Sequence, residues 1–161
     1  MAAKETIAIV SDRSGFPLKA AVVEYLKSRE DVEVLDFGLA SAEENEPYDV
    51  QAPKVARAIQ EGKAARGVAI CGTGQGMAIV ANKYKGIYAV VADTVFAASK
   101  GRIINNANVV TMGGWITAPK LGTDIVQSWL DLKFTETMED RAEWLKGAFG
   151  RVQAIEAENF S

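Results

Sequence analysis

The sequence predicts an α/β fold in which a doubly wound, five-stranded parallel sheet of the Rossmann-like type is followed by a C-terminal helical arm. Short β-rich segments alternate with helical ones along most of the chain, as in parallel sheets whose crossovers are helices. The third strand segment, residues 67–71, is a continuous apolar run, which is typical of a strand buried on both faces. With 161 residues, 48% of them apolar and 24% charged, residues 1–161 are expected to form one globular domain.

Five strands and five helices are expected before the arm. The strands span residues 6–11, 32–38, 67–71, 87–92 and 108–113. The helices span residues 17–28, 50–61, 77–84, 94–102 and 119–133. Pro17 suits the first turn of a helix and Gly62 suits the position just past a helix end, so both residues mark boundaries.

The last segment, residues 139–160, has a helical pattern that Gly147 and Gly150 are expected to interrupt. It carries Trp144, Leu145 and Phe149, and a single sheet leaves little surface for them to cover. Packing on the chain's own core and packing on a second subunit both stay open. The second is expected for a terminal helix that lies outside a compact layer.

Composition narrows the possible partners and chemistry. The net charge of −3 argues against nucleic acid or an anionic membrane as the main partner, because both bind clustered Lys and Arg. The N-terminus lacks the apolar core of a signal peptide and no apolar run approaches ~18 residues, so a cytoplasmic location is expected. A single cysteine allows no intrachain disulfide. The chain has no histidine, so proton transfer has to use Cys, Asp, Glu, Lys or Tyr.

The segment Cys71–Gly76 is the strongest candidate site. Gly72, Gly74 and Gly76 follow the apolar strand and precede a helix, so backbone N–H groups can face a ligand without intervening side chains. The spacing is neither the dinucleotide fingerprint nor a P-loop. The segment therefore predicts a cradle for an anion or an oxyanion, with a tight turn that binds nothing as the alternative.

Cys71 strengthens the first interpretation. It ends a buried strand beside a helix N-terminus, where the positive end of the helix dipole stabilises a thiolate. A lone cysteine is more often an inert core residue. A base next to an array of N–H donors, however, suits removal of a proton α to a carbonyl, with the donors stabilising the enediolate oxygen.

Several motifs resemble the ribose-5-phosphate isomerase B / galactose-6-phosphate isomerase family. The most specific is C-G-T-G-Q-G-M-A-I-V-A-N-K at residues 71–83. S-D-R-S-G-F-P-L-K at residues 11–19 and N-N-A-N-V-V-T-M-G at residues 105–113 resemble other parts of the family pattern. The likeness extends to about residue 134 and returns at residues 151–155.

The resemblance implies a function and assigns residues to it. It implies aldose–ketose isomerisation of a sugar phosphate without metal or cofactor, in a homodimer or a dimer of dimers with active sites between subunits. Cys71 would be the base, assisted by Thr73. The enediolate cradle would comprise Gly72, Gly74, Gln75, Gly76 and Met77, and the substrate would be bound by Asp12, Arg13, Tyr48, Asn105 and Arg151.

The sequence departs from that pattern where the substrate is chosen. Arg13 and Ile104 stand where ribose-phosphate members of the family carry histidines, the second of which opens the furanose ring. Trp115 and Gly147 stand where those members carry arginines. Arg13 could bind phosphate through its planar guanidinium. Lys146 and Arg141 are further candidate cations in the arm.

Ile104 cannot relay a proton to a ring oxygen, so the substrate could be one that needs no ring opening. A tetrose 4-phosphate has O4 esterified and cannot form a furanose ring. An isomerase for an open-chain tetrose 4-phosphate is therefore an alternative to one for a pentose 5-phosphate or a hexose phosphate. Two other classes remain open, namely a sugar-phosphate binder without activity and, more remotely, a nucleotide-binding module.

Overall fold

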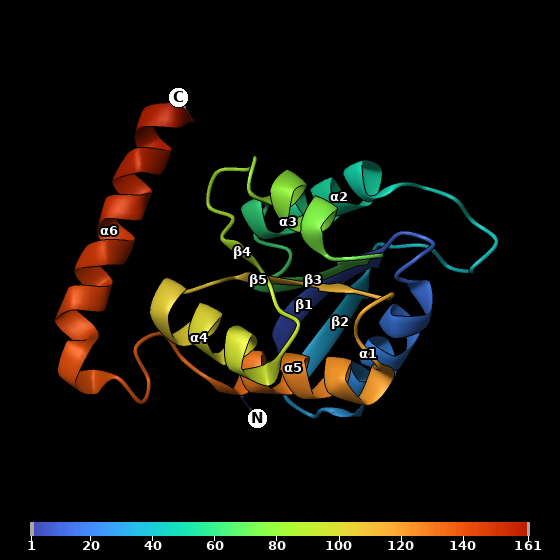
Figure 1. Ribbon diagram of the computed structural model, residues 1–161, viewed down its shortest axis with the longest axis horizontal. Helices are drawn as coiled ribbons and strands as arrows, with labels where there is room; N and C mark the ends of the chain where they lie inside the picture. The colour runs from blue at the N-terminus through green and yellow to red at the C-terminus, as the bar shows by residue number, and fades with distance from the viewer. Residues whose placement is uncertain (1, 161) are drawn as a thin grey trace.

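The computed structural model describes residues 2–160 and confirms the predicted sheet. Its five strands are all parallel and lie in the order β2-β1-β3-β5-β4 (Figure 1). The strands are β1 (Glu5–Ser11), β2 (Val32–Asp36), β3 (Arg66–Cys71), β4 (Ala89–Val91) and β5 (Val109–Gly113).

The strand register places the chemistry-bearing loops together. Ser11 at the end of β1 pairs with Ile70 of β3, and Cys71 at the end of β3 pairs with Gly113 at the end of β5. The loops that follow β1, β3 and β5 therefore all leave the sheet at the carboxyl ends of its strands. Ligands of open α/β sheets bind outside the carboxyl ends of the strands, so this edge is where a site is expected.

Helices cover both faces of the sheet (Figure 1). One face packs against α1 (Phe16–Ser28), α4 (Val95–Asn105) and α5 (Pro119–Asp131), and the other against α2 (Tyr48–Gln60) and α3 (Gln75–Ala81). Neighbouring residues of β1 point to opposite faces, as the period of two in a strand requires. Ile7 and Ile9 enter the first core, which holds Trp129, whereas Ala8 and Val10 enter the second.

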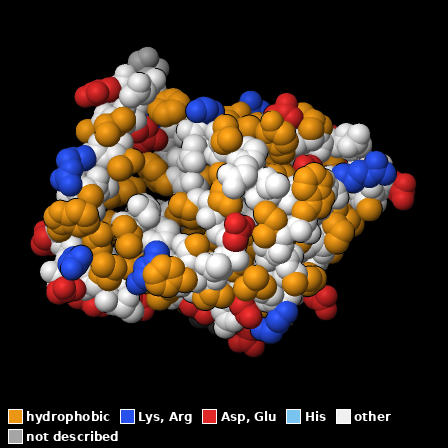
Figure 2. Space-filling model, in the orientation of Figure 1, with side chains coloured by type: hydrophobic (Ala, Val, Ile, Leu, Met, Phe, Trp, Pro, Cys, Tyr) orange, Lys and Arg blue, Asp and Glu red, His pale blue; other side chains and the backbone are white. Residues whose placement is uncertain are grey.

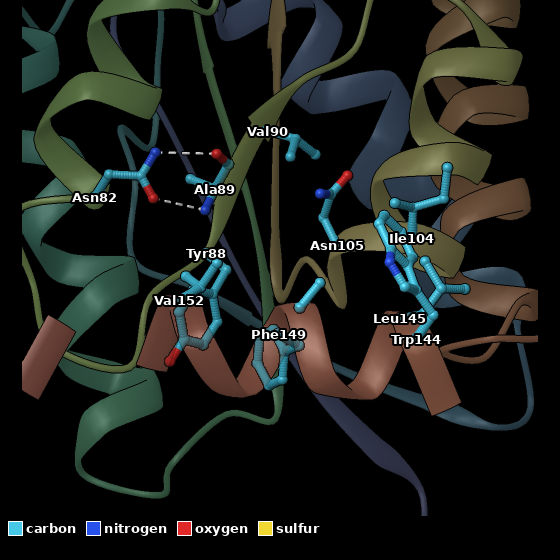
Figure 3. Close-up of a pocket in the computed structure, with 11 residues that line it drawn as sticks. Asn82, Tyr88, Ala89, Val90, Ile104, Asn105, Trp144, Leu145, Phe149 and Val152 are labelled. Atoms are coloured by element: carbon cyan, nitrogen blue, oxygen red, sulfur yellow. Dashed lines mark hydrogen bonds between the residues drawn. The ribbon is translucent and has the colours of Figure 1, made fainter. Parts of the chain in front are cut away.

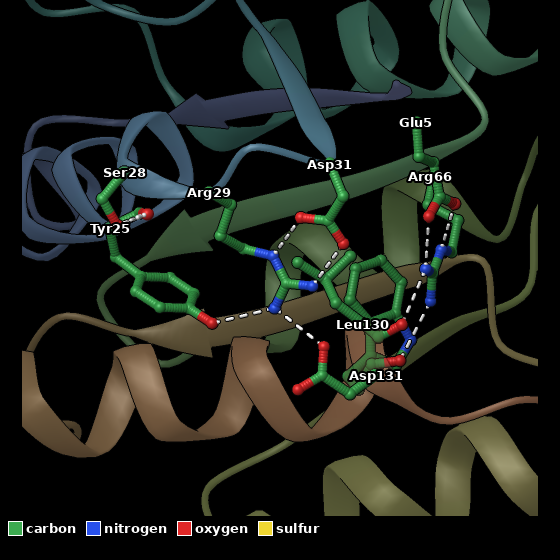
Figure 4. Close-up of polar contacts among 9 residues, drawn as sticks. Glu5, Tyr25, Ser28, Arg29, Asp31, Arg66, Leu130 and Asp131 are labelled. Atoms are coloured by element: carbon green, nitrogen blue, oxygen red, sulfur yellow. Dashed lines mark hydrogen bonds and ion pairs between the residues drawn. The ribbon is translucent and has the colours of Figure 1, made fainter. Parts of the chain in front are cut away.

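Two arginines tie the amino-terminal edge of the sheet to α5 (Figure 4). Arg66 is buried, pairs with Glu5 and donates to the carbonyl oxygens of Trp129 and Leu130. Arg29 pairs with Asp31, and its other contacts are Asp131 and the Tyr25 hydroxyl. Both networks lie at the edge opposite Cys71, so they stabilise the fold without reaching the candidate site.

The C-terminal arm is one continuous helix, α6 (Ala142–Asn159), preceded by a 3₁₀ turn, Glu139–Arg141. The expected interruption at Gly147 and Gly150 is wrong. Each glycine weakens a helix by only about 1 kcal/mol relative to alanine, and the Ala, Leu and Glu residues around them favour helix. Gly150 has open space around its Cα, so no tertiary contact competes with the helical path.

The arm stands away from the sheet beside α4 and β4 (Figure 1). Leu145 is its one buried residue, and Phe149 packs edge-on against Tyr88 at 5.0 Å between ring centroids. Trp144 and Ile155 remain 65% and 60% exposed. Figure 2 shows hydrophobic side chains along the arm and around the hollow that separates it from the body. The arm therefore touches its own chain along one side and leaves much of its apolar surface bare.

Smaller differences concern element ends. The helix after β4 runs three residues past its expected end at residue 102 and includes Asn105, because Asn106 adopts a left-handed conformation (φ 54°) that ends it. The α2 helix starts at Tyr48 and keeps Pro53 inside its first turns. Within residues 2–160, no helix combines the length and apolar character needed to cross a membrane.

Candidate active site

A pocket of about 350 Å³ opens at the carboxyl edge of the sheet. Loops after three strands and the start of α2 contribute to it, as the register requires. Its lining residues are Asp12, Ser14, Tyr48, Cys71, Gly72, Thr73, Gly76, Ile79 and Trp115. The structure therefore brings together six of the residues that the sequence singled out, which are Asp12, Tyr48, Cys71, Gly72, Thr73 and Gly76.

Cys71 is held at the floor of this pocket. Only 5% of the residue is exposed, and its Sγ accepts a hydrogen bond from the Gly74 amide at 3.1 Å. The amide hydrogen bond holds the sulfur in one orientation at the end of β3. The geometry suits a sulfur that acts as a base.

Gly74 makes this contact possible. Its φ of 80° is left-handed, and a Cβ atom there would lie 3.0–3.2 Å from the backbone of Met112. Only glycine meets both conditions without strain. The Thr111 hydroxyl donates to the Gly74 carbonyl at 2.9 Å and fixes the orientation of the turn.

The cradle is narrower than the sequence predicts. The Gly74 amide is taken by Cys71, and the Gln75 amide donates to the Thr73 hydroxyl at 3.3 Å. The amides of Gly76 and Met77 lie in the first turn of α3, where a helix offers no acceptor. Gly76 lines the pocket, so its amide is a donor that a developing oxyanion could use, whereas Met77 is fully buried and does not line the pocket.

Asp12 directly follows β1 and lines the same pocket. Its Oδ1 accepts a hydrogen bond from the Gly15 amide at 3.0 Å, which fixes the carboxyl group. Burial raises the pKa of Asp12, and amide hydrogen bonds from Gly15 and Ser14 oppose that rise. A fixed carboxyl group at this position can accept hydrogen bonds from sugar hydroxyls.

Three predicted substrate-binding residues do not line this pocket. Arg13 is exposed and donates through Nε to the carbonyl of Ala42 at 3.1 Å. Arg151 is exposed on α6. Asn105 lines a different pocket, of about 470 Å³, between α6 and the body. Among the described lining residues of the Cys71 pocket there is no Lys or Arg.

The second pocket is mostly apolar (Figure 3). Asn105 and Ile104 enter it from α4, and Trp144, Phe149 and Val152 enter it from α6. A reciprocal pair of hydrogen bonds joins the Asn82 side chain to the Ala89 backbone at its far end. Within one chain, Asn105 and Cys71 therefore line different pockets.

Sequence reasoning missed two contributors to the Cys71 pocket. In the sequence, Thr111 is only a polar residue within a predicted buried strand. Its hydrogen bond to Gly74 joins β5 to the loop after β3. Trp115 was noted only as a departure from a family pattern, yet its ring rests on Gly72. The glycine at position 72 was the one signal that something lies close to the backbone there. In residues 2–160, no three His, Cys, Asp or Glu side chains gather as metal ligands would.

Comparison with known proteins adds to this geometry. Residues 7–145 match the family model described as Ribose/Galactose Isomerase. The chain is 47% identical over 151 residues to the 4-deoxy-4-sulfo-D-erythrose isomerase of Clostridium sp. (strain MSTE9), which covers 93% of this chain and 94% of that one. It is 38% identical over 129 residues to the D-erythrulose-4-phosphate isomerase of Pectobacterium atrosepticum, covering 80% and 84% of the two chains.

A solved structure agrees with these matches. The ribose-5-phosphate isomerase B of Clostridium thermocellum superposes with a TM-score of 0.87 at 35% identity, over 96% of this chain and 99% of that one. The motifs at residues 11–19, 71–83 and 105–113 all fall within the matched family region. The chain therefore belongs to the ribose/galactose isomerase family, and it is an isomerase.

Proposed function

We propose that this chain interconverts an aldose and a ketose of four carbons that carry an anionic group, phosphate or sulfonate, at C4. The reaction type rests on the position of Cys71. Its Sγ accepts a hydrogen bond from the Gly74 amide in a pocket that Asp12 and Thr73 also line. The family membership supports isomerisation. The substrate is inferred separately, from what the pocket and the sequence lack.

The reaction needs one proton moved between neighbouring carbons. The Cys71 thiolate removes a proton from the carbon next to the carbonyl, and the electron pair moves to the carbonyl oxygen to give an enediolate. The amide of Gly76, which lines the pocket, stabilises the negative oxygen. The thiol then returns the proton to the other carbon, while the Thr73 hydroxyl assists proton exchange between the two oxygens. Asp12 holds the remaining hydroxyls.

The proposed length of the sugar, four carbons, follows from the absence of a group that could open a furanose ring. Furanose opening needs an acid or base at the ring oxygen, and the sequence contains no histidine. A four-carbon sugar with its C4 position occupied by phosphate or sulfonate has no O4 hydroxyl to close a furanose, so it enters in the open form. Two of the compared relatives carry names of four-carbon isomerases, one for a sulfonate and one for a phosphate.

A second copy of the chain completes the site. The Cys71 pocket has no lining cation among the described residues, and Asn105 faces the arm instead. The arm leaves Trp144 and Ile155 largely exposed, which is unfavourable for a helix that has no partner. In the proposed homodimer, Asn105 and Arg151 of one copy reach the Cys71 pocket of the other, with Lys146 and Arg141 as further candidate cations.

A substrate panel tests the reaction and the sugar. We expect kcat/KM to be highest for erythrose or erythrulose 4-phosphate, or for the 4-sulfo analogue, and clearly lower for ribose 5-phosphate and for hexose 6-phosphates. Cys71→Ser should lower kcat roughly a thousandfold and leave the melting temperature unchanged within a few degrees. Higher kcat/KM on ribose 5-phosphate contradicts the four-carbon substrate. Binding without turnover in the unaltered chain points to a sugar-phosphate binder instead.

A complementation experiment tests the shared site. Cys71→Ala and Asn105→Ala should each be inactive alone. Mixed and allowed to exchange subunits, they should recover about one quarter of the unaltered activity, because half of the dimers are mixed and each has one intact site. Recovery should fail at protein concentrations where ultracentrifugation shows monomers only. No recovery in a stable, exchanging dimer would show that each site uses residues of one chain.

A further inference from the structure

The indole ring of Trp115 lies on the backbone of Gly72, the residue that follows Cys71. A Cβ atom on Gly72 would come within 2.8–2.9 Å of ring atoms Cδ2, Cε3 and Cε2. Those atoms belong to the six-membered part of the indole, so the broad part of the ring covers the glycine. Trp115 thereby lines the Cys71 pocket, although 74% of the residue is exposed in the single chain.

Backbone hydrogen bonds fix the turn that carries this ring. The Trp115 amide donates to the Gly72 carbonyl at 3.0 Å, and the Gly114 amide donates to the Cys71 carbonyl at 2.7 Å. The Thr117 amide closes the turn by donating to Gly113 at 2.9 Å. The turn after β5 is thus bonded to the Cys71 loop, and the indole that lines the pocket extends from an anchored backbone.

A second ring bounds the other end of the loop. A Cβ atom on Gly76 would lie 2.7–2.8 Å from ring atoms Cδ2 and Cε2 of Tyr48. The two glycines thus each lie under an aromatic ring, and the two rings bound the loop that carries Cys71 and Thr73. A substrate that lies along this loop has to fit between Tyr48 and Trp115.

We infer that Trp115 sets the length of sugar chain that the pocket accepts, an inference that rests on the proposed isomerase function. The indole offers a flat apolar surface and carries no charge, so it cannot compensate the desolvation of an anionic group pushed against it. A sugar one carbon longer needs volume that the ring occupies. The four-carbon preference therefore comes from a wall at Gly72 as well as from the missing ring-opening group.

Replacing the wall should relax the length limit. The experiment uses the full chain and compares kcat/KM for erythrulose 4-phosphate and ribulose 5-phosphate in the unaltered protein, Trp115→Ala and Ile116→Ala. Ile116 is the neighbouring control, 52% exposed and not among the residues that line the pocket. Trp115→Ala should raise the five-carbon to four-carbon ratio about tenfold, the discrimination that roughly one methylene gives in a pocket. Ile116→Ala should leave it unchanged.

A double-mutant cycle tests the same contact from the glycine side. Gly72→Ala places a methyl group where the indole lies, so the ring has to shift and the ratio should change. In the Trp115→Ala background the methyl group meets no ring, and Gly72→Ala should then change the ratio far less. Such non-additivity is expected only if the two residues act through their contact.

The same measurements distinguish a failure of the proposed role of Trp115 from a failure of the proposed isomerase function. A ratio in Trp115→Ala within about twofold of that in Ile116→Ala overturns the length role, since a lost wall should exceed that value. A protein that prefers ribulose 5-phosphate before any change overturns the four-carbon substrate, while the response of the ratio still reports on Trp115. No turnover on any sugar overturns both.

Discussion

Thr111, buried on β5, donates a hydrogen bond from its hydroxyl to the carbonyl oxygen of Gly74 at 2.9 Å. The bond joins β5 to the loop after β3, and the amide of the same glycine donates to Cys71. The two bonds fix both ends of one residue. The position of the amide over the sulfur thus depends on a side chain that does not itself line the pocket.

Thr111→Val should therefore impair turnover more than stability. Valine keeps the shape of threonine but loses the hydroxyl, and a single buried hydrogen bond contributes about 1 kcal/mol to the free energy of unfolding. We expect kcat to fall about tenfold with KM nearly unchanged, because the lost contact orients the reacting sulfur rather than the sugar. Thr111→Ser keeps the hydroxyl and should retain most of kcat. Equal kcat in the valine and serine variants would remove Thr111 from this role.

Gly74→Ala tests whether the left-handed turn matters for more than backbone strain. An alanine at φ 80° costs about 1–2 kcal/mol in any setting, and here its Cβ also lies 3.0–3.2 Å from the Met112 backbone. Gly62 is a matched control, because its φ is 70° and nothing lies within 4 Å of an added Cβ. Chemical denaturation should show a larger loss for Gly74→Ala than for Gly62→Ala, and only the former should lose activity. Equal losses in both variants, with activity kept, would show that the turn tolerates a side chain.

The sequence predicts this fold well because each signal was local. The apolar run at residues 67–71 and the alternation around it define the strands, and three glycines in the following five residues mark the loop. The contacts of Thr111 and Trp115 join residues about 40 apart, and their geometry depends on strand order, which local patterns do not encode. Asn105 and Arg151 were expected at a Cys71 site shared between subunits, and within one chain Asn105 lines a different pocket while Arg151 is exposed on α6. The predicted interruption of α6 is wrong because the helix-favouring residues around the two glycines outweigh their effect.

Arg66 should matter for stability and not for catalysis. It is 7% exposed, and its guanidinium joins Glu5 to the carbonyls at the end of α5 and lies 4.8 Å from the Trp129 ring centroid. Arg66→Met leaves Glu5 and two carbonyls without their partner, so the free energy of unfolding in urea should fall by roughly 3–5 kcal/mol. The value of kcat/KM for the folded protein should stay within about twofold, since the arginine lies at the edge of the sheet opposite Cys71.

A surface ion pair is the matched control for Arg66. Lys63 and Glu61 pair with side chains 63% and 51% exposed, and such pairs stabilise by about 0–1 kcal/mol. Lys63→Ala should thus leave the urea midpoint nearly unchanged. If Arg66→Met were equally mild, the buried network would contribute little beyond its packing.

The contact between Tyr88 and Glu156 should make the docking of the arm sensitive to alkaline pH. The Tyr88 hydroxyl donates to Glu156 Oε2 at 2.6 Å, and the other oxygen of the same carboxylate accepts from the Gly86 amide. Burial, and then the hydrogen bond to Glu156, raises the pKa of Tyr88 from 10.0 to about 12. The folded state thus holds the phenol proton more tightly than the unfolded chain does.

The sign of the effect follows from that difference. Below about pH 10 both states are protonated and the contribution of Tyr88 is complete, whereas between about pH 10 and 12 only the unfolded state loses its proton, so stability falls as pH rises. Melting temperatures of the unaltered protein and Tyr88→Phe should converge over that range, because phenylalanine has no proton to lose. Glu156→Gln removes the charge that opposes ionisation, so tyrosinate absorbance should appear at lower pH in that variant. A constant difference in melting temperature across the range, or an unchanged absorbance titration in Glu156→Gln, would show that the contact does not hold the arm through this proton.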